Sequence, residues 1–287
     1  MLTTLIDGLS LGAIYALIAL GYTMVYGIAK MLNFAHGDII MVGAYSVFTV
    51  LMLGDGVVSK ILAVVFAVAI CTVLGIVVER FAYRPLRGAS PLAVLITAIG
   101  VSYLLQGMAQ LIFGAKSQPV DFSIAGHVGG VKYSTIITLA VGAVIMTVLT
   151  LFVKYTRTGR AMVAVSEDRA AAQLMGVNVN AIIAVTFAIG SALAAAASVF
   201  YLMQIPATTP TLGSMPGIKA FTAAVIGGIG SIPGAMVGGI FLGIVEKICL
   251  SIPALASYTT AIEFSLLIIV LLVKPTGLLG KKRREKV

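Results

Sequence analysis

The sequence predicts an all-α polytopic membrane protein with eight or nine membrane segments. Of its 287 residues, 60% are hydrophobic and only 10% are charged, and the mean hydropathy is +1.12. Soluble proteins are about 45–50% apolar and about 25% charged, so this composition is not that of a soluble protein. At about 20 residues for each helical crossing, plus loops, the length allows eight or nine segments. We therefore expect a single transmembrane domain over residues 1–287.

Nine apolar segments, separated by polar or Pro- and Gly-containing stretches, account for this number. They cover residues 8–29, 33–53, 60–80, 91–113, 133–153, 180–203, 217–231, 234–250 and 257–273. The seventh segment, 217–231, is too short to cross a bilayer unaided. It is expected to be either a re-entrant half-helix or part of a broken span.

The distribution of basic residues predicts the orientation. An outside N-terminus puts fourteen of the nineteen Lys and Arg residues on the cytoplasmic side, where positive charge is favoured. These are Lys30, Arg80, Arg84, Arg87, Lys154, Arg157, Arg160, Arg169, Lys274, Lys281, Lys282, Arg283, Arg284 and Lys286. The C-terminus, with the basic tail 281–287, is then cytoplasmic. The net charge of +9 accordingly indicates contact with anionic membrane lipid and not with nucleic acid.

A short internal echo predicts an inverted repeat. The sequence GIVVER at 75–80 returns as GIVEK at 243–247, an offset of 168 residues, and the same offset lays the first span onto the span that begins near residue 180. In the predicted topology the paired segments run in opposite directions. Inverted repeats place a substrate path at their interface, near the bilayer midplane.

The longest polar interruption, residues 154–177, predicts a short helix outside the hydrocarbon. Ser166 is a good N-cap, Glu167 and Asp168 place negative charge in the first turn, and three alanines that favour helix follow. Gly176 stands where a helix would stop. About ten residues at about 1.5 Å each give about 15 Å, half of a bilayer crossing.

Several stretches resemble one family of transporters. The pattern Ala171-Ala172-x-x-x-Gly176 with Glu167 upstream resembles the cytoplasmic coupling loop of ABC-transporter permeases, which docks on the ATP-hydrolysing subunit. The stretches GLSLGAIYALIALGYTMVYGI, NFAHGD, ERFAYRPLR and GIKAFTAAVIGGIGSIPGAMVGG, at 8–28, 33–38, 79–87 and 217–239, are similar to the LivH-type permease of branched-chain amino-acid ABC importers. The resemblance covers the chain from residue 8 to residue 280.

This resemblance implies a permease of the bacterial plasma (inner) membrane that translocates leucine, isoleucine or valine inward. It implies no catalytic residues and no cofactor. The implied partners are two ABC ATPase subunits, a second related permease subunit, and an extracytoplasmic substrate-binding protein that delivers the amino acid.

Two sets of site residues follow. In the coupling helix, Glu167 and Asp168 are expected to cap the helix or contact the ATPase, Ala171, Ala172 and Leu174 to supply a small apolar surface, and Gly176 to end the helix. In the membrane, the ends of a short seventh helix would offer partial positive charge to a substrate carboxylate. The residues expected along the transport path are Asn33, His36, Gly37, Thr222 and Gly227.

Other motifs favour packing over chemistry. The chain has no Gly-x-x-x-x-Gly-Lys-Ser/Thr sequence, so it cannot be the ATPase itself. Glycines at four-residue spacing in 230–243 favour close helix packing over nucleotide binding. With His36 and His127 as the chain's two histidines, no metal site is expected, and Cys71 and Cys249 are expected to be small buried hydrophobes. Glu79, Glu246 and Glu263 lie near or within spans and are expected to pair with residues of other helices.

Two alternative functions are also compatible with the sequence. Permeases that import urea or another small amide share the fold and similar signatures. An ion-coupled secondary transporter would use Asp38 or Glu263 to carry the coupling ion. The coupling helix discriminates against the second alternative, because such a transporter does not need one.

Overall fold

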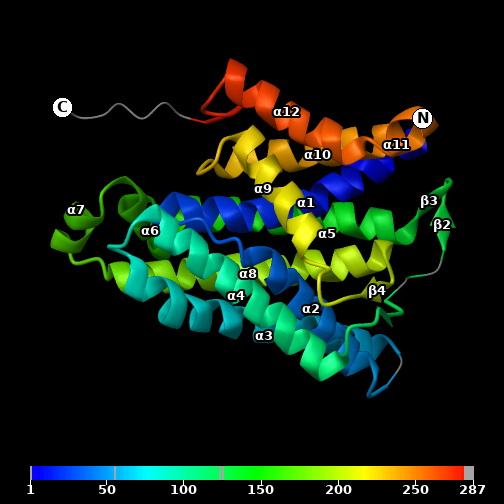
Figure 1. Cartoon of the computed structure of the whole chain (residues 1–287), viewed down its shortest axis with the longest axis horizontal. Helices are drawn as coiled ribbons and strands as arrows, with labels where there is room; N and C mark the ends of the chain where they lie inside the picture. The colour runs from blue at the N-terminus through cyan, green and yellow to red at the C-terminus, as the bar shows by residue number, and fades with distance from the viewer. Residues whose placement is uncertain (1, 55, 123, 125, 281–287) are drawn as a thin grey trace.

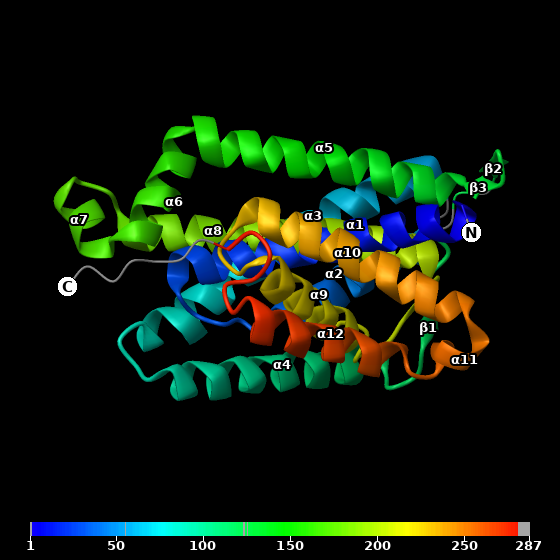
Figure 2. The same cartoon turned by 90° about the horizontal axis from the view of Figure 1, so that it is seen from above.

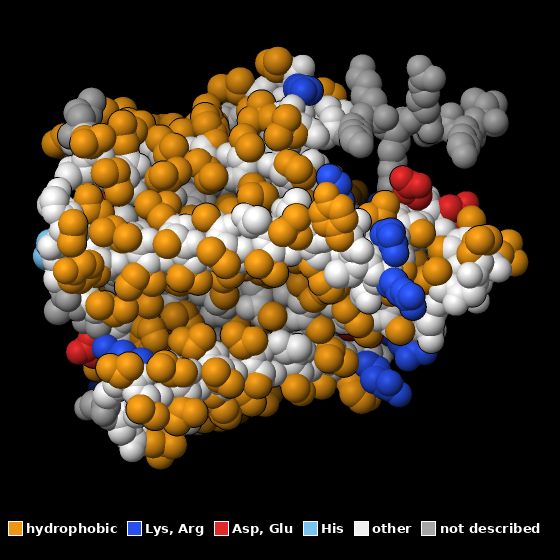
Figure 3. All heavy atoms as spheres, turned by 180° about the vertical axis from the view of Figure 1, so that it is seen from behind, with side chains coloured by type: hydrophobic (Ala, Val, Ile, Leu, Met, Phe, Trp, Pro, Cys, Tyr) orange, Lys and Arg blue, Asp and Glu red, His pale blue; other side chains and the backbone are white. Residues whose placement is uncertain are grey.

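Long helices lying side by side form one bundle (Figures 1 and 2). The structure, a computed structural model, describes residues 2–54, 56–122, 124 and 126–280. The predicted basic tail 281–287 lies outside the described residues. The long helices expose hydrophobic side chains around the bundle (Figure 3), as a lipid-facing surface requires.

The helices match the predicted segments closely. They are α1 (Leu2–Ala29), α2 (His36–Leu51), α3 (Val57–Val78), α4 (Pro91–Phe113), α5 (Tyr133–Tyr155), α6 (Arg157–Glu167), α7 (Arg169–Leu174), α8 (Val179–Gln204), α9 (Ser214–Gly227), α10 (Ile232–Ser251), α11 (Pro253–Ala256) and α12 (Thr259–Val273). A π-helical turn, η1 (Glu79–Tyr83), and a 3-10 turn, η2 (Arg84–Leu86), extend α3. Strand β1 (Gln118–Pro119) pairs antiparallel with β4 (Ala207–Thr208), and β2 (His127–Val128) with β3 (Val131–Lys132).

Two of the membrane segments are broken. Six helices, counted over the described residues, are long and apolar enough to span a membrane, whereas α2, α9 and α12 have only 16, 14 and 15 residues. Of these three, α2 and α9 each follow an irregular stretch, 30–35 before α2 and 205–213 before α9. The second segment therefore begins three residues later than predicted. The seventh segment is the half-helix of a broken span: β4 lies at the end of the bundle that carries the N-terminus, and α9 ends where the chain turns into α10 (Figure 1).

Helix α1 is the centre of the bundle. Most of its residues are buried, and it packs against α10, α8, α9 and α5. A helix that is apolar on all sides belongs in such a position.

The packing repeats under exchange of the two halves of the chain. Helix α1 packs on α10 as α3 packs on α8, and α2 packs on α3 and α8 as α9 packs on α10 and α1. Equivalent helices run in opposite directions, which supports the predicted inverted repeat (Figure 2).

The starts of the equivalent helices do not follow the predicted offset, however. Helix α8 begins 177 residues after α1, and α10 begins 175 residues after α3, whereas the GIVVER and GIVEK echo gave 168. The first of these sequences spans the end of α3 and the second lies inside α10. Equivalent helices differ in length, so their first residues do not fix equivalent positions, and the offset of 168 stays a prediction.

Glycines at the helix crossings hold these contacts, as predicted. A Cβ atom on Gly243 would collide with the backbone of Gly12, and one on Gly239 with the backbone of Ala16, where α10 crosses α1. In lipid, helices associate through such close packing because no hydrophobic driving force acts between them.

We predict that Gly243→Val lowers the stability of the bundle by about 1–3 kcal/mol, because the added methyl groups force α1 and α10 apart. The melting temperature of the detergent-purified protein measures the effect. Gly107→Val is the matched control, since nothing lies within 4 Å of the added Cβ on α4. Equal melting temperatures for the two variants would contradict the role of this crossing.

Candidate functional site

Helices α6 and α7 form a helical hairpin that projects from the end of the bundle opposite the N-terminus (Figure 1). Most of the Lys and Arg side chains visible in Figure 3 gather at this end. The sequence predicted one helix from Ser166, but α6 already runs through Ser166, whose hydroxyl donates to the carbonyl of Val163 at 2.7 Å. Asp168 is the N-cap of α7, and its carboxylate accepts the amide of Ala171 at 3.0 Å. The break falls there because Asp168 adopts an extended backbone (φ −149°).

The predicted helix end at Gly176 is confirmed. Its φ is +83°, and it closes α7 with the amide of Val177 donating to Ala172 and its own amide donating to Gln173, both at 3.0 Å. These two hydrogen bonds form a Schellman motif, which satisfies the last carbonyl groups of a helix.

The outer surface of α7 differs from the prediction at one residue. Ala172 is buried in the core, so it does not belong to the outward surface, while Ala171 is exposed. Leu174 is 89% exposed and Met175, which the sequence analysis did not single out, is 84% exposed. A six-residue helix turns one face inward, and the sequence did not show which.

Arg169 ties the hairpin to the central helix. Its guanidinium donates to the carbonyls of Ile28, at 3.3 Å, and Ala29, the last residues of α1. Burial, with the nearby charge of Arg87, lowers the pKa of Arg169 below its usual value. A cation at a helix C-terminus is stabilised by the helix dipole, and it satisfies carbonyls that lack helical partners.

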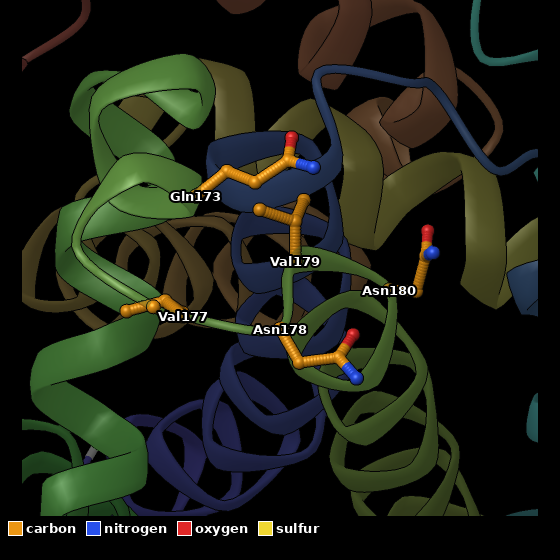
Figure 4. A pocket seen from close by; sticks show the side chains of 6 residues that line it. Gln173, Val177, Asn178, Val179 and Asn180 are labelled. Carbon is orange, nitrogen blue, oxygen red and sulfur yellow. The ribbon is translucent and has the colours of Figure 1, made fainter.

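Beside α7 the surface is hollowed (Figure 4). The hollow, about 350 Å³ in volume, is lined by Gln173, Gly176, Val177, Asn178, Val179 and Asn180. A neighbouring hollow continues to the end of α3, where Arg87 donates to the amide oxygen of Asn180 and to the carboxylate of Glu79. This surface offers amides and charges beside the apolar tip of α7.

The second site is the meeting point of the half-helices α2 and α9. Gly37 at the start of α2 lies against Gly213 and Gly217 at the start of α9, so closely that a Cβ atom on Gly213 would collide with the carbonyl of Gly37. His36 is buried beside them, with its ring 4.7 Å from the ring of Tyr22. Both broken helices therefore begin inside the bundle and at the same place.

A family model described as the permease component of the branched-chain amino acid transport system matches residues 4–271. The chain belongs to this family. It is a multi-pass membrane permease and hence a transport subunit.

The permease is similar over its whole length to known transport proteins. It is 44% identical to the high-affinity branched-chain amino acid transport system permease protein BraD of Pseudomonas aeruginosa, covering 100% of this chain and 98% of that protein. It is also 44% identical to LivH of Escherichia coli, covering 100% of this chain and 97% of that protein. The solved structure of PsaBC from Streptococcus pneumoniae in complex with a Fab shares the fold, with a TM-score of 0.51 at 18% identity over 96% of this chain and 92% of that chain.

The permease brings together only part of the predicted path. His36 and Gly37 meet the start of α9, and Asn33 accepts a hydrogen bond from Tyr83 at 2.7 Å. Thr222 is buried further along α9. Gly227 lies at the far end of α9, about 20 Å from its start, where it packs against Gly234 in the first turn of α10.

A polar cluster at the same place was not predicted from the sequence. The side chain amide of Gln106 on α4 donates to the carboxylate of Asp38 at 2.8 Å and lies 3.4 Å from the hydroxyl of Ser214 on α9. An isolated Gln within an apolar segment was the one sign of this cluster in the sequence. It does not reveal that Asp38 is its partner.

The buried glutamates have cationic partners. Lys219 of α9 binds Glu246 of α10 at 2.7 Å and Glu263 of α12 at 3.2 Å, and Tyr15 of α1 donates to Glu246 at 2.7 Å. These partners come from other helices, as predicted. Glu79 pairs instead with Arg87, which is only eight residues further along the chain. The π-helical and 3-10 turns between them fold the backbone so that Arg87 returns to Glu79.

We predict that Arg169→Ala loosens the hairpin by about 1–2 kcal/mol, because the last carbonyls of α1 lose their charged donor. Hydrogen exchange of the α7 amides in the purified permease should become faster. Arg160→Ala, an exposed arginine of α6, is the control and should leave the exchange unchanged. Unchanged protection of α7 in Arg169→Ala would show that the hairpin is held by other contacts.

Proposed function

We propose that this permease moves a branched-chain amino acid (leucine, isoleucine or valine) inward across a bacterial inner membrane. The observation that carries the proposal is its 44% identity, over the full length, to two permeases named for high-affinity branched-chain amino acid transport. The sequence has no Gly-x-x-x-x-Gly-Lys-Ser/Thr motif, and in this proposal the energy comes from ATP hydrolysis in separate ABC ATPase subunits.

In this proposal the ATPase docks on the α6–α7 hairpin. The hairpin ends in two exposed apolar side chains, Leu174 and Met175, which lie outside the long apolar helices. Exposed apolar residues of a short helix suit a groove on a partner protein. Glu167 and Asp168 lie at the junction of the two helices, where Asp168 caps α7 and Glu167 is exposed to the partner.

The remaining partners belong to the same proposal. A second related permease completes the membrane path, and an extracytoplasmic binding protein delivers the amino acid to the side that carries the N-terminus. Anionic lipid surrounds the basic end of the bundle.

Reconstitution tests the transport proposal. The permease is placed in proteoliposomes with its partner permease, two ATPases and binding protein, and uptake of radiolabelled leucine is compared with uptake of urea. ATP-dependent uptake of leucine but not of urea is expected. Uptake of urea, or no uptake of any branched-chain amino acid, would overturn it.

We predict that Leu174→Asp prevents the ATPase subunits from co-purifying with the permease, because it puts a charge into an apolar contact at a cost of several kcal/mol. Leu53→Asp is the matched control: this leucine is 85% exposed and lies in the turn between α2 and α3. If the ATPase co-purifies with Leu174→Asp as well as with the control, the hairpin is not part of the interface.

The orientation is tested by labelling. Val128→Cys in β2 should react with an impermeant thiol reagent added outside intact cells, and Arg160→Cys in α6 should not. Both positions are exposed, and the native Cys71 and Cys249 are buried, so background labelling is low. Labelling of Arg160→Cys but not of Val128→Cys would show that the orientation is the opposite one.

A further inference from the structure

A polar cluster interrupts the apolar surface between α4 and α9. Asp38 is buried at 2% exposure, and the amide of Gln106 lies 2.8 Å from its carboxylate and 3.2 Å and 3.4 Å from the hydroxyls of Ser102 and Ser214. Ser102, Gln106 and Ser214 are themselves partly exposed. The cluster is therefore open on one side of the chain.

The cluster lies near the middle of the membrane. Asp38 follows Gly37 at the α2–α9 crossing, and the neighbouring His36 lies against Gly21 of α1. Gly21 is eight residues before the end of α1, or about 12 Å along it, in a hydrocarbon core about 30 Å thick. Partly exposed polar side chains at this depth do not face lipid tails, so they line a path for water and solute or meet a protein partner.

Asp38 differs from the other buried carboxyl groups in having no ion-pair partner among the described residues. The other buried carboxylates, Glu79, Glu246 and Glu263, each have a Lys or Arg partner. Within the described residues no basic side chain forms an ion pair with Asp38, whose polar contacts come from neutral amide and hydroxyl groups. A buried anion held only by neutral groups is suited to receive a cation.

We propose that Asp38 receives the α-ammonium group of the amino acid as it passes the α2–α9 crossing. This inference rests on the proposed function. The exposed side chains of Met215 and Ile218, one and four residues after Ser214 on α9, suit a branched aliphatic side chain. Gln106 and Ser102 orient the carboxylate for the incoming ammonium.

The alternative is that Asp38 only tethers α4, which packs loosely against the rest of the bundle. Two substitutions separate these roles. Asp38→Asn removes the charge but keeps a carbonyl oxygen that can accept the hydrogen bond of Gln106. Gln106→Leu removes the tether but keeps the carboxylate.

The experiment uses the complete importer in proteoliposomes and measures leucine transported per ATP hydrolysed in the presence of loaded binding protein. Asp38→Asn is expected to lower this ratio at least about tenfold while ATPase stimulation persists, and Gln106→Leu to lower it by less than about threefold. Asp7→Asn is the control, because it removes the same charge at a carboxylate that accepts a hydrogen bond from Thr135, away from the crossing.

A wild-type ratio in Asp38→Asn would overturn the inference, and so would a parallel loss of uptake and ATPase stimulation, which a structural role predicts. If the wild-type importer moves no branched-chain amino acid at all, the proposed function itself fails.

A second pair of variants imitates the substrate. Ser214→Lys brings a tethered ammonium group to Asp38, whereas Ser214→Met adds a chain of similar length without the charge. Leucine uptake should be at least about fivefold lower in the lysine variant, because its ammonium competes for the carboxylate. Equal uptake in the two variants would contradict the proposed role of Asp38.

Discussion

The contact on which the fold depends is the meeting of Gly37 with Gly213 and Gly217. Neither side can carry a Cβ atom there, so two backbones approach directly and the half-helices α2 and α9 begin inside the bundle. Irregular backbone at membrane depth is tolerated only where protein or water covers its polar groups. The long helices α1, α3, α8 and α10 supply that cover, and their own crossings use the same device of small residues. The arrangement of the whole bundle follows from the need to enclose this meeting point.

The same enclosure connects the membrane interior to the hairpin. Arg169 binds the end of α1, and α1 packs directly on α9 and α10. Lys219 holds α9 to its neighbours through Glu246 and Glu263, and separating such charges in a low-dielectric interior costs several kcal/mol. Helix α9 is therefore joined to α1, α10 and α12 as one unit, while α4 on the other side of the polar cluster packs loosely. The hairpin is thus joined to the crossing by direct contacts through α1.

Sequence patterns predicted the features that depend on composition and local chemistry. Hydropathy located nine segments, and the φ-permissive Gly176 marked the end of α7. Features that depend on which helices meet were not predicted. Ala172 was predicted to lie on the outer surface of α7. Packing against the bundle buries it instead, and the local sequence carries no information about that packing. The Asp38–Gln106 bond joins residues 68 positions apart, which no local pattern reports. Broken spans are visible in sequence only as a short apolar run, so the start of α2 was placed three residues early.

The central claim is that the start of α9 borders a water-accessible path at mid-membrane depth. A water-soluble thiol reagent applied to the assembled importer tests it most directly, with Ser214→Cys at the crossing and Val144→Cys on α5, which is 60% exposed halfway along a lipid-facing helix. The buried Cys71 and Cys249 are replaced by alanine in both variants. The account predicts that Ser214→Cys reacts and that Val144→Cys does not. If Ser214→Cys is as unreactive as Val144→Cys, the crossing is a packed core and the path lies elsewhere.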